Sequence, residues 1–245
     1  MGRVSVRPMS SPDTEVAGTL ALVGGGEWRD GTRDLDAALL DASGGTEVLV
    51  LPTAAAYEDP DRVVDAARSH FAELGATVTA LPVLHRAEAE DADISETVRD
   101  ARFVYFADGS PLHLRSVLKG SALFEALLAA YRSGAVLAAS GAGATVLCDP
   151  MVDPRGGAYT VGLGVVEGVA VFPYHGSAAD HLRERSLDLL PANAVLVGID
   201  EETALLRLPG AHWSVAGQGT VTLYSSSSPK VGEELRPGTK EIPLP

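Results

Sequence analysis

The sequence predicts an α/β protein, a three-layer α/β/α sandwich whose central sheet is mostly parallel. Through about the first 150 residues, apolar segments of four or five residues alternate with segments whose apolar positions recur at helical spacing. This alternation is typical of βαβ units and of a doubly wound sheet. The chain has 245 residues, of which 46% are hydrophobic and 21% charged, enough to bury one large core.

The expected elements of this first part follow one another in a regular order. Short apolar runs predict strands at 19–23, 47–51, 77–84, 103–106 and 135–138. Apolar positions every three or four residues predict five helices. One begins with the pattern at 35–40, and the others cover 60–74, 94–101, 112–118 and 123–131.

After about residue 150 the sequence predicts more strands and fewer helices than in the first part. Strand-like segments are expected at 159–166, 169–172, 195–199, 204–208, 213–215 and 220–224, with a helix at 181–190. Several come at hairpin spacing, which predicts an antiparallel C-terminal portion of the sheet. We therefore expect a flexible leader at 1–17, a single domain at 18–225 and a poorly ordered Pro-rich tail at 226–245.

Composition excludes several classes of partner. The net charge of −14 argues against nucleic acid and anionic membranes. The sequence has no apolar run long enough to span a bilayer and no N-terminal apolar segment typical of a secretory signal, so we expect a cytoplasmic protein. A metal or cofactor is not expected either. The chain has a single cysteine and no H-E-x-x-H, and its first glycine run lacks the G-x-G-x-x-G pattern.

The most informative stretch is AVLAASGAGATVL at 135–147, a buried strand that turns through very small residues into a helix. This pattern is typical of a nucleophile elbow, in which small neighbours allow one side chain to stand above the sheet. The apex of the pattern is Gly141, which has no side chain to act as nucleophile. Ser140 precedes the apex by one residue, so its side chain should point away from the direction in which position 141 points.

Glycine-rich or short polar segments follow two other predicted strands, at 24–27 and 107–110. In parallel sheets, ligands bind at the carboxyl ends of the strands. We therefore expect these two segments and the elbow to converge on one crevice.

Ordered motifs across 18–225 carry a resemblance to a known family: GGGE at 24–27, FADGSPLHLRSVL at 106–118, ASGAGA at 139–144, GLGVVEGVAVFPYH at 162–175 and GIDEETALL at 198–206. Together they resemble the cyanophycinase and dipeptidase E (peptidase E) family of serine peptidases. The resemblance implies a fold like the glutaminase domain of class I glutamine amidotransferases.

The resemblance also implies roles for residues of a Ser-His-acid triad. The family's serine falls on Gly141, and its catalytic histidine falls on His175. In an active relative the histidine takes the proton of the serine and an acid orients the imidazole. Asp153 is the nearest candidate for that acid, with Asp149 and Glu167 behind it.

The resemblance further implies an oxyanion hole, formed by the backbone amides of Gly109 and Ala142. The family has a Gly-Gly pair in this stretch, of which the first is replaced here by Asp108 and the second is kept as Gly109. Ser110 lies in the same stretch and is a candidate for substrate binding. Glu27 could bind a substrate amine or cap the glycine turn that precedes it.

Three functions remain open from the sequence. The first is a hydrolase homologue that has lost its covalent nucleophile and keeps a pocket for a small acidic or peptide-like ligand. The second is an active hydrolase that uses Ser140, or a nucleophile activated by His175. The third is a non-catalytic interaction protein with a vestigial pocket. The resemblance also implies a homodimer.

Overall fold

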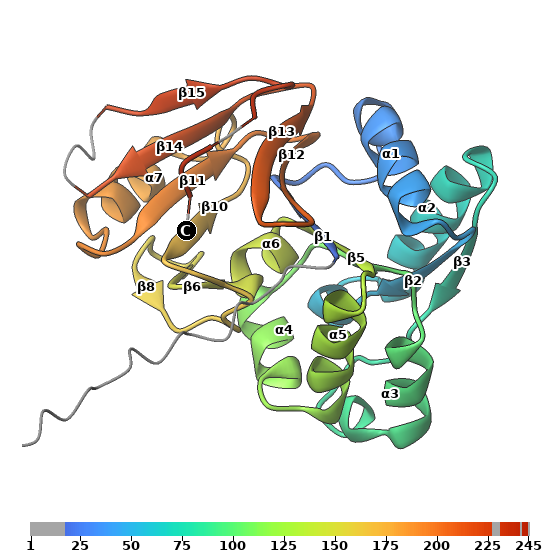
Figure 1. Ribbon diagram of the computed structural model, residues 1–245. Helices are drawn as coiled ribbons and strands as arrows, with labels where there is room; N and C mark the ends of the chain where they lie inside the picture. Colours follow the sequence, from blue (N-terminus) through green and yellow to red (C-terminus); the bar gives the residue numbers. More distant parts are fainter. Residues whose placement is uncertain (1–17, 227–230, 241, 245) are drawn as a thin grey trace, which may run out of the picture.

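The computed structural model describes residues 18–226, 231–240 and 242–244 and has a large mixed sheet covered by helices on both faces (Figure 1). The predicted leader at 1–17 lies outside the described residues. The strand order of the large sheet is β13-β12-β1-β5-β4-β2-β3. Its strands are β1 (Thr19–Val23), β2 (Glu47–Leu51), β3 (Thr77–Ala80), β4 (Phe103–Phe106), β5 (Val136–Ser140), β12 (Thr203–Leu208) and β13 (His212–Gly217).

The predicted mostly parallel sheet is confirmed. Strands β1, β5, β4, β2 and β3 pair in parallel, and the hairpin of β12 and β13 adds to β1 in antiparallel orientation. The parallel strands β1, β4 and β5 are buried along their whole length, as expected where helices cover both faces.

Two layers of helices enclose this sheet. The core on one face is completed by α1 (Arg33–Ser43) and α2 (Pro60–Glu73). The core on the other face is completed by α3 (Ala92–Arg99), α4 (Pro111–Leu118), α5 (Ala122–Arg132) and α6 (Ala142–Leu147). Adjacent side chains of β1 alternate between the two cores: Leu20 and Leu22 face one, Ala21 and Val23 the other. Short 3-10 turns at Asp30–Thr32, Thr53–Ala55 and Glu88–Glu90 lie in the connections.

A second sheet follows the elbow, in the order β10-β11-β14-β15. It contains β10 (Val169–Phe172), β11 (Val195–Ile199), β14 (Val221–Ser225) and β15 (Glu233–Leu235). Residues of one face join the main core, while the other face packs against α7 (Asp180–Asp188). Two small ribbons complete the region: β6 (Cys148–Asp149) with β9 (Val166–Glu167), and β7 (Met151–Val152) with β8 (Tyr159–Thr160).

The structure differs from the predicted elements in three places. The third strand ends at Ala80 rather than at 84, and the expected strand at 159–166 is reduced to β8 and β9 at its two ends. The predicted tail at 226–245 contains β15, which pairs with β14, and Ile242 is buried in the main core. Hairpin spacing predicted the strands β11 to β14 but did not show that they divide between two sheets.

Within the described ranges, no helix is both long and apolar enough to cross a membrane.

Candidate functional site

The elbow is present and its apex is glycine. β5 ends at Ser140, α6 begins at Ala142, and Gly141 between them has φ +47° and ψ −102°. This left-handed region is unfavourable for residues that carry a Cβ. A Cβ on residue 141 would also lie only 2.2 Å from Oδ1 of Asp108. The space above the apex is therefore filled by the carboxylate of Asp108.

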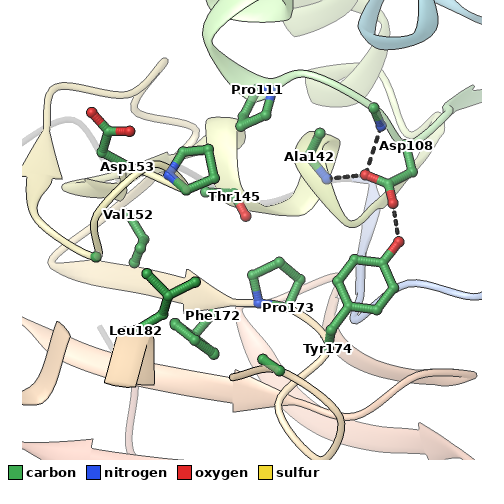
Figure 2. A pocket seen from close by; sticks show the side chains of 14 residues that line it. Asp108, Pro111, Ala142, Thr145, Val152, Asp153, Phe172, Pro173, Tyr174 and Leu182 are labelled. Atoms are coloured by element: carbon green, nitrogen blue, oxygen red, sulfur yellow. Dashed lines mark hydrogen bonds between the residues drawn. The ribbon is translucent and has the colours of Figure 1, made fainter. Parts of the chain in front are cut away.

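That carboxylate binds the two amides to which the resemblance gave the role of an oxyanion hole. The backbone N–H of Gly109 donates to Asp108 Oδ1 over 2.7 Å, and the N–H of Ala142 donates to the same oxygen over 2.6 Å. The hydroxyl of Tyr174 donates to Oδ2 (Figure 2). Amides that bind a carboxylate form charge-assisted hydrogen bonds, which are stronger than bonds between neutral groups. The arrangement stabilises an anion at the elbow, and that anion is the protein's own side chain.

Ser140 points into the protein rather than toward the cavity. It is fully buried, and its Oγ donates to Glu27 Oε2 over 2.7 Å. The other carboxylate oxygen of Glu27 accepts from the backbone N–H of Asp108 over 3.1 Å. Burial raises the pKa of Glu27, and the nearby negative charge of Asp108 raises it further. The three strand exits expected to converge therefore do meet, through Glu27, Asp108 and Ser140.

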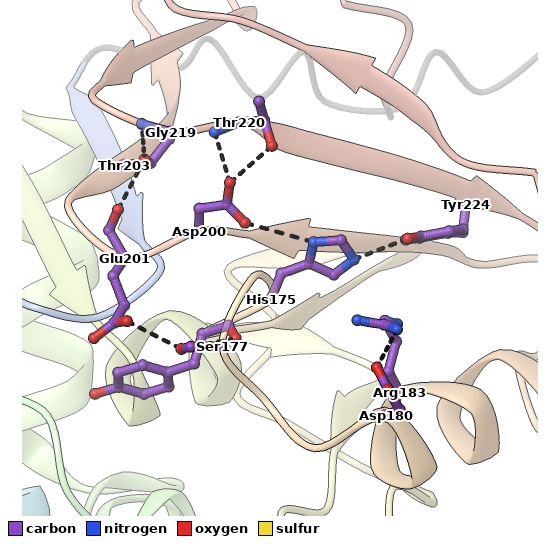
Figure 3. A network of polar contacts seen from close by, with 11 residues as sticks. His175, Ser177, Asp180, Arg183, Asp200, Glu201, Thr203, Gly219, Thr220 and Tyr224 are labelled. Atoms are coloured by element: carbon purple, nitrogen blue, oxygen red, sulfur yellow. Dashed lines mark hydrogen bonds and ion pairs between the residues drawn. The ribbon is translucent and has the colours of Figure 1, made fainter.

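His175 contacts the second sheet. Its Nδ1 lies 3.6 Å from Oδ1 of Asp200, and its Nε2 lies 2.8 Å from the hydroxyl of Tyr224 (Figure 3). A Cβ on residue 198 would lie 2.3 Å from the imidazole, so Gly198 leaves room for the ring. Burial lowers the pKa of His175, while the carboxylate of Asp200 opposes that shift. The residue that reaches the elbow from this loop is the preceding one, Tyr174.

The carboxylate beside His175 is thus Asp200 rather than Asp153. Asp153 accepts hydrogen bonds from the guanidinium of Arg155, over 3.0 Å from Nε and 2.6 Å from Nη2. These bonds lower the pKa of Asp153. The other two candidates lie elsewhere, because Asp149 accepts from the N–H of Gly162 and Glu167 is exposed. These three residues do not contact His175 because the segment 149–167 folds into the two small ribbons.

Ser110 has a structural contact at the start of α4. Its Oγ accepts from the N–H of His113 over 3.3 Å, which caps the helix, and its own N–H donates to the carbonyl of Ala54 over 2.8 Å. These bonds fix the loop that carries Asp108 and Gly109.

A cavity of about 230 Å³ lies beside the elbow. Asp108 and Tyr174 stand on one side of it and Asp153 on the opposite side, as Figure 2 shows. Its remaining walls are mostly apolar and come from Pro111, Ala142, Thr145, Val152, Pro154, Phe172, Pro173, Ala178 and Leu182, with Gly109 and Gly157. Over the ranges that the structure describes, no three or more His, Cys, Asp or Glu side chains are grouped so as to hold a metal ion.

Tyr174, Asp200 and Tyr224 are the site residues that the sequence analysis did not single out. A signal was available for one of them. Asp200 lies within the GIDEE motif at 198–202, which had contributed only to the resemblance. Tyr174 lies in a turn with φ +54°, so strand alternation does not predict which way its side chain faces. Tyr224 carries no comparable signal, because it reads as one more residue of a buried strand.

Comparison with known proteins identifies relatives of the whole domain. The family model described as peptidase family S51 matches residues 20–211. A cyanophycinase from Geminocystis herdmanii is 27% identical over 228 residues, which cover 86% of this chain and 81% of the relative.

Two solved structures are also similar to this chain over most of its length. The crystal structure of a peptidase from an acI-B1 actinobacterium is 31% identical with a TM-score of 0.82, covering 93% of this chain and 97% of the other. A putative peptidase E from Listeria monocytogenes, 16% identical, has the same fold with a TM-score of 0.60, covering 89% of this chain and 99% of the other.

Proposed function

Because the chain belongs to peptidase family S51, we infer that it is a member impaired in covalent peptidase chemistry that binds a small peptide-like ligand in the cavity beside the elbow. In serine hydrolases the elbow presents the attacking oxygen, and nearby amides stabilise the negative charge that develops on the substrate oxygen. In this protein the residue at the apex, Gly141, has no side chain, and the amides of Gly109 and Ala142 bind Asp108.

The observation that carries the proposal is the position of the Asp108 carboxylate. It accepts from the amides of Gly109 and Ala142, and it lies where a side chain on residue 141 would begin. A substrate oxygen would have to displace this anion to reach the amides. Loss of a triad nucleophile costs on the order of 10⁶ in kcat in a well-studied serine protease. The cavity itself stays open, which supports binding without acyl transfer.

The contacts of Ser140 and His175 give less support to an active serine hydrolase. Ser140 is fully buried against Glu27, out of reach of a substrate in the cavity. His175 contacts Asp200 and Tyr224, neither of which belongs to the elbow.

Covalent labelling tests the loss of chemistry. The unmodified protein is treated with a fluorophosphonate probe beside an active S51 peptidase, and the intact masses are measured. We expect an adduct on the control peptidase and none on this protein. A stoichiometric adduct that maps to Ser140 would contradict the proposal and identify a working hydrolase.

Ligand binding is tested separately, by calorimetry with short peptides. Ala178 lines the cavity without contributing to the elbow, so Ala178→Phe is the matched variant that fills the cavity. We expect a peptide to bind the wild-type protein, to remain uncleaved, and to bind the folded variant at least tenfold more weakly. If no peptide binds and no adduct forms, the remaining interpretation is an interaction protein with a vestigial pocket.

A further inference from the structure

The lining of the cavity carries charge of only one sign. Among the residues that the structure describes, the lining has two carboxylates, Asp108 and Asp153, and no Lys, Arg or His. The walls between them are apolar, with Val152, Phe172 and Leu182 on the side away from Asp108 (Figure 2).

The two carboxylates differ in their partners. Asp153 forms an ion pair with the guanidinium of Arg155, at 2.6 Å. The partners of Asp108 within the described ranges are neutral, namely two backbone amides and the hydroxyl of Tyr174. In the described part of the chain, Asp108 takes part in none of the ion pairs. Its charge is therefore stabilised by hydrogen bonds but not balanced by a cation.

A second carboxylate adds to this negative potential. Glu27 accepts from the N–H of Asp108, and it too belongs to none of the ion pairs among the described residues. Two like charges at close range in a partly buried site repel one another. A cation bound at Asp108 would relieve that repulsion, whereas an anion would increase it.

We propose that the cavity binds the amino-terminal residue of a peptide, with its ammonium group at Asp108 and an apolar side chain against Val152, Phe172 and Leu182. The proposal rests on the peptide-binding function proposed above and specifies the class of ligand. A volume of about 230 Å³ lies below the usual range of about 300–1,000 Å³ for ligand pockets, so it accommodates one residue rather than a longer segment. An acidic ligand is disfavoured, because the amides that would bind it already hold Asp108.

Three derivatives of leucine separate charge from shape. Leucinamide is cationic at pH 6.5, N-acetylleucinamide is neutral, and N-acetylleucine is anionic. Each is titrated by calorimetry into the wild-type protein and into Asp108→Asn. The asparagine keeps an oxygen that accepts from the Gly109 and Ala142 amides. It removes the charge, and it presents an NH₂ donor to the Tyr174 hydroxyl in place of the acceptor Oδ2. We expect leucinamide to bind best to the wild type and at least tenfold more weakly to the variant, with the neutral derivative little affected.

The inference is overturned on its own if a neutral or anionic derivative binds as tightly as leucinamide, or if Asp108→Asn leaves leucinamide binding unchanged. In those cases the cavity still binds a peptide-like ligand and the proposed function stands. If none of the three derivatives nor any short peptide binds, the proposed function fails together with the inference. Far-UV circular dichroism of Asp108→Asn verifies that the variant is folded.

Discussion

At the scale of single residues, a side chain at position 141 and a carboxylate at position 108 compete for the same space. A Cβ on residue 141 would lie 2.2 Å from Asp108 Oδ1, well inside van der Waals contact. The carboxylate could rotate away, but it would then lose its hydrogen bonds to Gly109 and Ala142. The two positions are therefore energetically coupled.

A double-mutant cycle measures this coupling. We expect Gly141→Ser to lower the free energy of unfolding by about 1–3 kcal/mol, from backbone strain and displacement of Asp108. In Asp108→Gly/Gly141→Ser the clash is absent, so the serine should cost less than it does beside Asp108. Denaturant titrations of the wild type, Asp108→Gly, Gly141→Ser and the double variant give the four free energies of unfolding. Gly75→Ser is the matched control, because Gly75 also has positive φ (+76°) but nothing within 4 Å of a Cβ. Strictly additive effects would show that Asp108 and position 141 are independent.

Glu27 is expected to make stability depend on pH. Its folded pKa is raised above the ordinary value of 4.5, so the folded state binds its proton more readily than the unfolded state does. The contribution of Glu27 is therefore fully present below pH 4.5 and is lost as the pH rises through the folded pKa. Glu27→Gln removes this titration and the repulsion with Asp108. We expect the variant to gain stability over the wild type at pH 7 to 8.

Denaturant titrations at pH 4 and pH 8 test this prediction. The amide can still accept from the N–H of Asp108, while its NH₂ group donates to Ser140. A stability difference that is the same at both pH values would contradict the assigned shift. Glu58→Gln, which changes an exposed carboxylate, controls for the change in net charge.

At the scale of elements, helices α1 and α2 are joined by a close contact between a buried histidine and a buried aspartate. His70 Nε2 lies 2.9 Å from Oδ2 of Asp36, and the side chains are 8% and 0% exposed. The aromatic ring of Phe71 next to His70 packs edge-on against Phe103 and Tyr105 of β4. The His70–Asp36 contact therefore lies next to the aromatic contacts that join α2 to the sheet.

Removing one partner of the pair should destabilise the fold strongly. We expect His70→Ala to lower the free energy of unfolding by about 3–5 kcal/mol, because the Asp36 carboxyl group would remain buried without its imidazole partner. Asp36→Leu/His70→Leu removes both polar groups and should be less destabilised than the single variant. Chemical unfolding curves of the three proteins decide this. Equal stability of the single and double variants would show that the pair does not act as a unit.

The elements were also the level at which the sequence was most informative. Buried parallel strands read as continuous apolar runs, and the helices between them have apolar positions at regular spacing, so β1 to β5 and their helices were placed from pattern alone. The pattern does not encode which way a loop residue faces. The catalytic role of His175 was taken from the resemblance, whereas the structure brings Tyr174 to the elbow and leaves His175 with Asp200.

At the scale of the whole molecule, the C-terminal segment completes the second sheet. β15 pairs with β14, Leu235 is 8% exposed, and Ile242 is 6% exposed. From the sequence the domain was expected to end at 225, because the run of serines and prolines that follows is typical of a tail. Composition could not show that a short strand beyond this run returns to the sheet, since that pairing depends on contacts distant in sequence.

Truncation tests how much this segment stabilises the domain. We expect a protein that ends at residue 226 to unfold at a lower temperature, because burial of two aliphatic side chains contributes about 3–6 kcal/mol. Leu235→Ala should reproduce part of this loss, while Val231→Ala at a position 75% exposed should have little effect. Calorimetric melting temperatures provide the comparison. An unchanged melting temperature after truncation would show that the segment is dispensable.

The overlap between positions 108 and 141 also constrains evolutionary history. In a lineage that began with serine at the elbow, an aspartate at 108 could not adopt its present position while that serine remained. Asp108 could bind the Gly109 and Ala142 amides only after the side chain at 141 was lost, whichever substitution came first. Reversion from glycine to serine would then displace Asp108 from these amides. Each substitution therefore makes reversal of the other less favourable for stability.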